Sequence, residues 1–350
     1  MSSATASSLP AGLERTTPAA GLNVVCVGGG TGLATLLSGL KAFVRRPAEP
    51  PGVGRSEPGT IGRLTAIVTV SDDGGSSGRL REEFQVLPPG DIRNCIAALS
   101  EESSVLLKLF NYRFGGNGTL GGHSFGNLLL TALSSVTGDF VHAVRLVGEV
   151  LAIRGTIYPS TCENVRLMAE LEDGSIVRGE SRISQSHVRI RSLRLEPERC
   201  PALPETLDAI AAADLIVLGP GSLYTSIVPN LLVDGVAGAL RESRAHKVLV
   251  CNLMTQTGET RGFSASDHAQ ALRGIAGEGL FDTALVNSRV PPTALIDKYR
   301  LEGAEVVTCD PEGFEGMPVR VVSRDLMSAT DLVRHEPEIL AREVLALVRP

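Results

Sequence analysis

Two glycine-rich segments carry the strongest chemical signal in this 350-residue chain. The first, residues 28–32, follows an apolar run at 23–27 and precedes leucines at helical spacing. The second, residues 219–222, follows the apolar run 215–218. Glycines in such turns let backbone N–H groups approach a ligand, and a helix N-terminus adds unpaired donors and a partial positive charge. The anion-binding candidates are therefore Gly28, Gly29, Gly30, Thr31, Gly32, Gly219, Gly221 and Ser222.

The spacing of the first glycines argues against a nicotinamide cofactor. The dinucleotide fingerprint G-x-G-x-x-G would need its third glycine where the chain has Leu33. A nicotinamide-dependent oxidoreductase is therefore disfavoured. Because the carboxyl ends of parallel strands meet at one edge of a sheet, the two loops together can hold one phosphorylated ligand. The alternative is two unrelated tight turns without a ligand.

Two adjacent carboxylates, Asp72 and Asp73, follow the apolar run 64–70 and precede glycines and serines. Neighbouring carboxylates at a strand end are suited to holding Mg²⁺ against a diphosphate, with Asp91 as a further oxygen ligand. One of them could equally accept a hydrogen bond from a ribose, as acidic residues after a second strand do. The alternative roles are turn capping for Asp72 and capping of its own helix for Asp91.

Residues 122–126, G-H-S-F-G, match the G-x-S-x-G pattern of a hydrolase nucleophile. A nucleophile elbow needs an apolar strand directly before it, whereas residues 115–121 are rich in glycine, so a serine hydrolase is disfavoured. His123 and Asn127, at the start of a helix, are instead candidates for contacting a ligand phosphate or sugar. The alternative is that Ser124 caps this helix.

Composition excludes several classes of partner. The net charge is −6, Trp is absent and aromatic residues make up 4% of the chain, so we expect no nucleic acid partner. Six widely spaced cysteines without a C-x-x-C pair indicate free thiols in a reducing cytosol. No apolar run approaches membrane-spanning length, and the N-terminus lacks the order of a signal peptide. We therefore predict a cytoplasmic protein without membrane insertion.

The elements that must position these residues are those of an α/β fold. Continuous apolar runs of strand length alternate with helical patterns, which is typical of a Rossmann-like, three-layer parallel sheet. Further strands are expected near 248–252, 281–286, 305–308 and 319–323, followed by a closing helix over 337–348. Between 164 and 195, alternating residues around the turn Asp173-Gly174 predict a small antiparallel β insertion with strands at 165–171, 175–183 and 188–195.

The domain organisation follows from composition. Residues 1–22 are small and polar and predict a disordered tail. Residues 23–350 predict one α/β domain. Within it, residues 46–63 contain prolines and glycines that cannot hold a helix or a central strand, and they predict an exposed loop insertion.

Six segments occur in a characteristic order: VGGGTGLATLLSGLK, VTVSDDGGSSGRLRE, PPGDIRNC, GHSFGNLLL, IVLGPGSLYTSIVPNLLV and CNLMTQTGET. Together they resemble the gluconeogenesis factor (YvcK) family, a branch of the CofD-like superfamily that contains 2-phospho-L-lactate transferase. The likeness runs from about residue 23 to the closing residues 333–336 and so covers nearly all of the chain.

The resemblance implies a CofD-like α/β domain over 23–350 in a cytoplasmic gluconeogenesis factor. Members bind UDP-sugars, UDP-N-acetylglucosamine (UDP-GlcNAc) in particular, and are required for cell shape and cell-wall synthesis on gluconeogenic carbon sources. Asp72 and Asp73 fall where the transferase branch carries its metal and substrate carboxylates, whereas the form SDDGGSSG is that of the gluconeogenesis branch. By motif match, the resemblance also implies that four further residues belong to the nucleotide site: Asn252, Thr255, Gln256 and Arg334.

Two functional hypotheses follow. The leading one is a UDP-sugar-binding regulatory protein without turnover, because the sequence shows a phosphate-binding edge and no poised nucleophile or general base. The alternative is a Mg²⁺-dependent transferase of the 2-phospho-L-lactate transferase type, with Asp72, Asp73 and Asp91 as metal ligands, since such a transfer needs mainly positioning and charge neutralisation. A homodimer and regulatory protein partners in cell-wall synthesis are further partner hypotheses.

Overall fold

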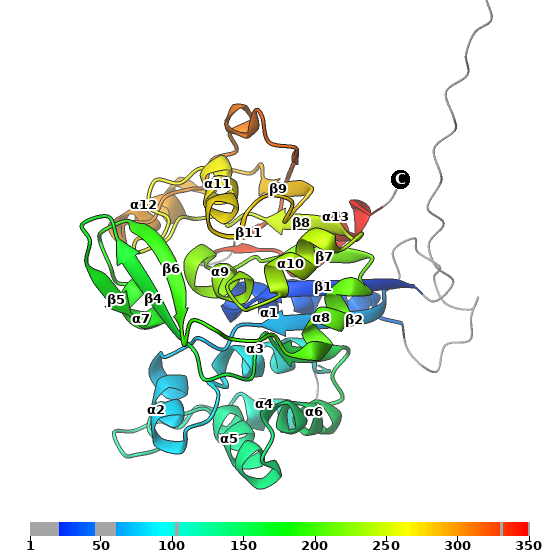
Figure 1. The fold of residues 1–350 in the computed structure, drawn as a ribbon, viewed down its shortest axis with the longest axis vertical. Helices are drawn as coiled ribbons and strands as arrows, with labels where there is room; N and C mark the ends of the chain where they lie inside the picture. The colour runs from blue at the N-terminus through cyan, green and yellow to red at the C-terminus, as the bar shows by residue number, and fades with distance from the viewer. Residues whose placement is uncertain (1–20, 46–60, 102–104, 330–331, 349–350) are drawn as a thin grey trace, which may run out of the picture.

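The computed structural model describes residues 21–45, 61–101, 105–329 and 332–348 (Figure 1). Its centre is a seven-stranded sheet in which every adjacent pair is parallel. In spatial order the strands are β10 (Arg320–Arg324), β9 (Thr283–Asn287), β8 (His246–Val250), β7 (Leu215–Leu218), β1 (Leu22–Gly28), β2 (Ile61–Val68) and β3 (Thr156–Pro159). The predicted Rossmann-like parallel sheet is therefore confirmed.

Helices cover both faces of this sheet. The chain moves from β1 to β2 in one direction and from β7 to β8 in the other, so right-handed crossovers put the two sets of connecting helices on opposite faces. The helices are α1 (Gly30–Leu40), α2 (Gly75–Phe84), α3 (Gly90–Leu99), α4 (Val105–Phe110), α5 (Phe125–Thr137), α6 (Phe140–Val150), α7 (Glu180–Ile183), α8 (Pro204–Ala211), α9 (Val228–Leu231), α10 (Val236–Glu242), α11 (Ala265–Ala276), α12 (Thr293–Leu301) and α13 (Pro337–Ala346).

The core is built by the central strands and by the leucine face of α1. Val24, Cys26 and Val27 of β1 are fully buried because strands on both sides and helices on both faces enclose them. Leu33, Leu36, Leu37 and Leu40 of α1 are fully buried as well, at the helical spacing seen in the sequence. α1 packs between α3 and α13, so the residues that precede it are held at a fixed place on the sheet edge.

The β insertion is a three-stranded antiparallel sheet, in the order β5 (Ile176–Arg178), β4 (Arg166–Leu171) and β6 (Ile190–Glu196) (Figure 1). This confirms the predicted antiparallel unit. The strand expected over 175–183 is wrong in its second half, because Gly179 takes a φ of +93° and the short helix α7 follows. A second small sheet, the hairpin β11 (Met327–Ala329) with β12 (Val333–His335), was not anticipated.

Three further boundaries differ from expectation. Residues 305–308 form no strand and contribute one isolated bridge, between Met254 and Val306. β2 begins at Ile61, inside the predicted loop insertion 46–63, because Ile61 pairs with Leu22 of β1. Strand β3 was missed, since its four residues include a proline. Residues 1–20 of the predicted tail and 46–60 of the predicted loop lie outside the described residues.

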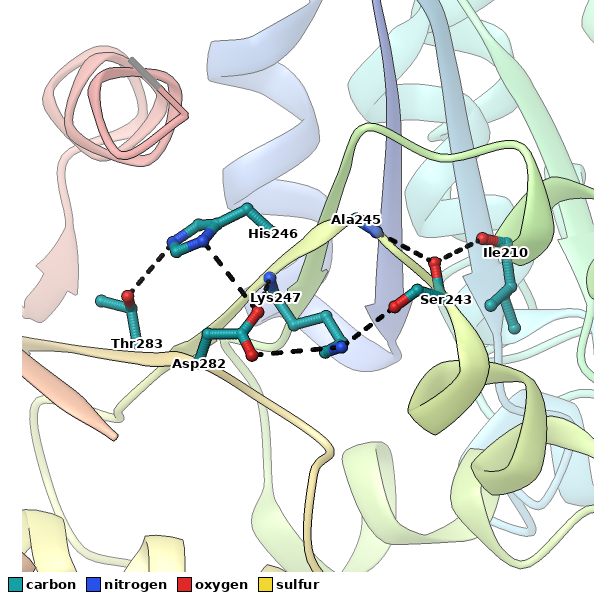
Figure 2. A network of polar contacts seen from close by, with 7 residues as sticks. All are labelled: Ile210, Ser243, Ala245, His246, Lys247, Asp282 and Thr283. Atoms are coloured by element: carbon teal, nitrogen blue, oxygen red, sulfur yellow. Dashed lines mark hydrogen bonds and ion pairs between the residues drawn. The ribbon is translucent and has the colours of Figure 1, made fainter. Parts of the chain in front are cut away.

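The two ends of the sheet differ in character. At the amino ends of β8 and β9, Lys247 lies close to Asp282, with 4.0 Å between Nζ and Oδ1, and donates to the Ser243 carbonyl oxygen at 3.2 Å (Figure 2). His246 pairs with Thr283 beside it, 3.1 Å from Nε2 to Oγ1. This network links β8 to β9 and so stabilises the fold. In the described part of the chain, no helix is both long and apolar enough to cross a membrane.

Candidate functional site

One pocket opens between the carboxyl ends of β1 and β7, where the strand order reverses and where open α/β sheets bind ligands. Its volume of about 330 Å³ lies at the lower end of the range for small-molecule sites. Four chain segments line it, far apart in sequence. They contribute Gly29, Gly30, Thr31, Gly32, Thr35, Pro220, Gly221, Ser222, Ser226, Asn252, Leu253, Met254, Gln256, Val333, Arg334 and His335.

The first glycine loop places the N-terminus of α1 against the second loop. Gly30 has a φ of +64°, which favours glycine. A Cβ on Gly32 would lie 2.5 Å from the carbonyl oxygen of Pro220, so only glycine allows the two loops to touch. The first turn of α1 has neither a side-chain cap nor an acidic residue. Backbone N–H donors at this helix end therefore face the pocket without a competing anion on α1.

The second loop is clamped by two amide side chains that were predicted as ligand contacts. Asn252 Oδ1 accepts from the Gly221 N–H at 3.2 Å, and its Nδ2 donates to the Gly221 carbonyl oxygen at 2.9 Å. Gln256 Nε2 donates to Ser222 Oγ at 2.6 Å. Both side chains line the pocket, and both set the shape of the loop. Asn252 uses both ends of its amide in doing so.

Asp91 has a role different from the cap predicted for its own helix. The N-cap of α3 is Pro89, and Asp91 lies buried in the first turn. Its carboxylate instead accepts a hydrogen bond from the backbone of Gly30, at the start of α1. Burial and, to a smaller extent, the nearby Asp72 raise the pKa of Asp91 to about 7. The prediction of a local cap was wrong because the partner lies on another element, far away in sequence.

Asp72 and Asp73 point to different partners. Asp72 Oδ1 accepts from the Gly74 N–H at 2.8 Å, which is the turn capping considered as an alternative. Asp73 Oδ1 accepts from the Ser181 N–H at 2.9 Å and so ties the loop to the β insertion. Burial raises the pKa of Asp72. Across the described ranges, no group of three or more His, Cys, Asp or Glu side chains is arranged to hold a metal ion.

Two further carboxylates belong to this region and gave no sequence signal, the buried Glu259 and the half-buried Glu180. Glu259 accepts from the Tyr224 N–H at 3.0 Å and from Thr225 Oγ1 at 2.8 Å. Glu180 accepts weakly from Ser71 Oγ at 3.4 Å. Burial raises the pKa of both, and for Glu180 the neighbouring Asp91 and Asp72 add to the effect. The carboxyl edge of the sheet thus holds a group of acids whose pKa values are raised.

His123 and Asn127 lie together outside the pocket lining. His123 Nδ1 is 2.9 Å from Ser76 Oγ, and Asn127 Nδ2 donates to the same oxygen at 3.1 Å. Ser124 caps α5 by accepting from the Asn127 N–H, as in the alternative interpretation. Burial lowers the pKa of His123, and the nearby Arg79 lowers it further. These residues join α2 to α5.

Gly219 is not among the lining residues, and two other predicted residues also lie away from the lining. Thr255 exchanges hydrogen bonds with Glu305: its N–H donates to the Glu305 carbonyl oxygen at 2.7 Å, and its Oγ1 accepts from the Glu305 N–H at 2.8 Å. Gly28 ends β1, where its carbonyl oxygen accepts from Asn230 Nδ2 at 3.1 Å. Both residues support the segments that line the pocket.

A further part of the pocket lining comes from the unanticipated hairpin. Arg334 was expected at the site and lines it as an exposed side chain. His335 beside it was missed. Burial lowers the pKa of His335 to about 4, partly offset by a hydrogen bond to the backbone of Cys251. The imidazole is therefore neutral at pH 7.

Comparison with known proteins places this architecture in a family. The family model described as 2-phospho-L-lactate transferase CofD matches residues 24–327. The gluconeogenesis factor of Bacillus subtilis is 44% identical over 327 residues, covering 93% of this chain and 98% of that protein. The gluconeogenesis factor of Halalkalibacterium halodurans is also 44% identical, covering 92% and 95%. A crystal structure of a UPF0052 family member from Bacillus halodurans matches with a TM-score of 0.86 and 43% identity, covering 93% of this chain and 99% of that one. The chain therefore belongs to the CofD family and, within it, to the gluconeogenesis factors.

Proposed function

We propose that this protein is a UDP-sugar-binding gluconeogenesis factor whose ligand is UDP-GlcNAc, and that it supports cell shape and cell-wall synthesis during growth on gluconeogenic carbon sources. The observation that carries the proposal is the pocket at the reversal of strand order, where both glycine loops meet. The N-terminus of α1 offers donors for a diphosphate at this point. Curated relatives that match nearly the whole chain are named gluconeogenesis factors.

The charge of the lining supports an anionic ligand. Among the described residues that line the pocket, Arg334 is the one cation and none is acidic. It lies on a different chain segment from the glycine loops, so a diphosphate in the pocket would have both backbone donors and a guanidinium available. Asp91, buried directly behind the first glycine loop, has a pKa raised to about 7, which reduces its repulsion of a phosphate.

Calorimetry with UDP-GlcNAc, UDP, GDP and NADH, with and without Mg²⁺, tests this proposal. We expect the uridine nucleotides to bind and the Arg334→Ala variant to lose about tenfold or more in affinity, as for a lost charge-assisted hydrogen bond. Arg342→Ala is the matched control, because Arg342 is an exposed arginine of α13 that lies outside the pocket lining. Absence of binding by any uridine nucleotide at millimolar concentration contradicts the proposal.

A second candidate is a Mg²⁺-dependent transferase of the 2-phospho-L-lactate transferase type. Two observations favour it: the CofD family match, and the position of Asp91 directly behind the phosphate loop, where a Cβ on Gly29 would lie 2.6 Å from Asp91 Oδ2. Mg²⁺ is commonly held by one or two carboxylates together with substrate phosphates, so Asp72 and Asp91 would suffice without a third protein ligand.

Product analysis separates the two candidates. A transferase forms product from a nucleotide donor only with Mg²⁺ and with intact carboxylates, so Asp72→Asn abolishes turnover. A regulatory protein binds UDP-GlcNAc with or without Mg²⁺ and forms no product in either condition.

A further inference from the structure

Exposed apolar side chains gather on α4 and on the turn that follows it. In the part of the chain that the structure describes, twelve large apolar side chains are exposed, and four of them fall within residues 105–112. They are Val105 (78% exposed), Leu106 (50%), Leu109 (44%) and Tyr112 (53%). Single exposed apolar residues are ordinary on a protein surface, whereas a contiguous group of them marks a surface that binds a partner.

The spacing of these four side chains places them on one face. Val105, Leu109 and Tyr112 follow one another at intervals of four and three residues, and Leu106 lies three residues before Leu109. The chain keeps turning beyond the end of α4, because the Tyr112 N–H donates to the Leu109 carbonyl oxygen at 2.9 Å. Phe110, which is 1% exposed, anchors the other side of α4 against α5. The helix is thus attached to the body by one side and presents an apolar face on the other.

Cations lie beside this face. Lys108 and Arg113 belong to the same segment, and residues 105–125 contain no Asp or Glu. Arg113 Nη1 donates to the Gly122 carbonyl oxygen at 2.6 Å, and Arg79 Nη2 donates to the Gly121 carbonyl oxygen at 2.8 Å. Within the described ranges, none of these three cations forms a salt bridge.

The electrostatics of the adjoining loop confirm that this charge is not neutralised locally. Burial lowers the pKa of His123, and Arg79 and Arg113 lower it further. Glu83 of α2 offsets only part of their effect. The surface beside α4 is therefore positive as well as apolar.

These properties decide between possible occupants of the face. An apolar face beside cations without carboxylate partners is complementary to an acidic surface with exposed apolar side chains. A second copy of this chain is a poor match, because a two-fold interface would place Lys108 and Arg113 against the same cations. A lipid surface is also a poor match, since membrane-bound amphipathic helices bury a large apolar face and α4 has six residues. Arginines held by backbone carbonyl oxygens have a fixed orientation, which suits the carboxylates of a protein.

We propose that the α4 face docks an acidic amphipathic segment of a partner protein. The face consists of Val105, Leu106, Leu109 and Tyr112, with Lys108 and Arg113 beside them. Apolar side chains of the segment cover the two leucines, and its carboxylates pair with the two cations. α4 contributes no residue to the pocket lining, so this surface is separate from the proposed nucleotide site and adds to the proposed function a means of acting on another protein.

Two synthetic helical peptides serve as probes. One has leucines on one face and glutamates on the other, and the second has glutamine in place of every glutamate. Fluorescence anisotropy measures the binding of each labelled peptide to the full chain. We expect the glutamate peptide to bind about tenfold more tightly, the effect of two or three exposed ion pairs, and its affinity to fall as salt is added.

Two double variants test the residues of the face. Leu106→Ser with Leu109→Ser removes apolar contact, and Lys108→Glu with Arg113→Gln removes the positive charge while keeping a donor for the Gly122 carbonyl oxygen. Each should weaken binding of the glutamate peptide by about tenfold or more. All four side chains are exposed, so the variants should fold normally.

The matched controls change exposed residues far from the face. Leu301→Ser alters a leucine of α12 that is 90% exposed, and Arg342→Glu alters an exposed arginine of α13. α12 lies toward the other end of the molecule from α4 (Figure 1). Both controls should leave the affinity for the glutamate peptide within about twofold of wild type.

Four results would overturn the proposal. The first two are equal affinity for the two peptides and unchanged affinity in the folded double variants. The third is binding of the wild type to phosphatidylglycerol vesicles that the two leucine substitutions abolish, because the face would then bind lipid. The fourth is a wild-type dimer in sedimentation that the same substitutions convert to a monomer, because a second copy would then cover the face.

Discussion

At the residue scale, Asp91 shows how the functional edge of the sheet is held together. This carboxyl is buried, bonds to the backbone of Gly30 and has a pKa near 7, so it is partly neutral at physiological pH. From the sequence, Asp91 could be selected as important because it follows Pro-Pro-Gly at a helix start. Its actual partner could not be predicted, since no local pattern links residue 91 to residue 30. The same limit applied to Glu180 and to His335.

Asp91 predicts a defined pH dependence of stability. Its folded pKa of about 7 lies above the ordinary 3.8, so the folded state binds the extra proton and stability falls as pH rises from about 4 to 7. Asp91→Asn keeps an oxygen acceptor for Gly30 and removes the titration. We expect the variant to gain stability relative to wild type as pH rises through this window, by roughly 4 kcal/mol at most above pH 7. Denaturant unfolding at pH 5, 7 and 8.5 measures the difference; a difference that does not change with pH contradicts this account.

At the element scale, the pocket depends on two loops that touch and on a hairpin that closes the wall. The strands and helices that carry the loops were predictable, because continuous apolar runs such as Leu215–Leu218 and the leucine spacing of α1 are strong patterns. The hairpin β11–β12 was not, because its strands have three residues each and make only one pairing. β3 was missed for a similar reason. Short elements are specified by their tertiary neighbours, which leave little trace in the local sequence.

The contact between the loops predicts the effect of a single methyl group. Gly32→Ala places a Cβ 2.5 Å from the Pro220 carbonyl oxygen and must push α1 away from the second loop. We expect a loss of about 1–3 kcal/mol in stability, as for overpacking, together with a loss of nucleotide affinity. Gly238→Ala is the control, since that helical glycine of α10 faces open space and should gain about 0.5–1 kcal/mol. Thermal unfolding measures the change in stability of both variants. An equal change in the two would contradict this account, because it would show that the loops can separate without a cost in stability.

At the scale of the whole molecule, contacts that stabilise the fold lie at one end of the sheet, and the candidate site lies at the other. The amino ends carry the network of Lys247 and Asp282, which ties neighbouring strands together (Figure 2). The carboxyl ends carry the pocket, the clamped loops and the buried acids. The parallel sheet and the meeting of the two glycine loops at its carboxyl edge could be predicted from the alternation of apolar runs and helices, whereas the order of the strands came from the structure. Which side-chain atoms are already paired, such as both ends of the Asn252 amide, could be learned only from the structure.

The most direct test of the central claim is a crystal structure of the protein with UDP-GlcNAc. The account predicts that the diphosphate lies within hydrogen-bond distance of the first-turn N–H groups of α1 and of Arg334. A nucleotide bound elsewhere, for example beside His123 and Asn127, or a protein that takes up no UDP-GlcNAc, would contradict it.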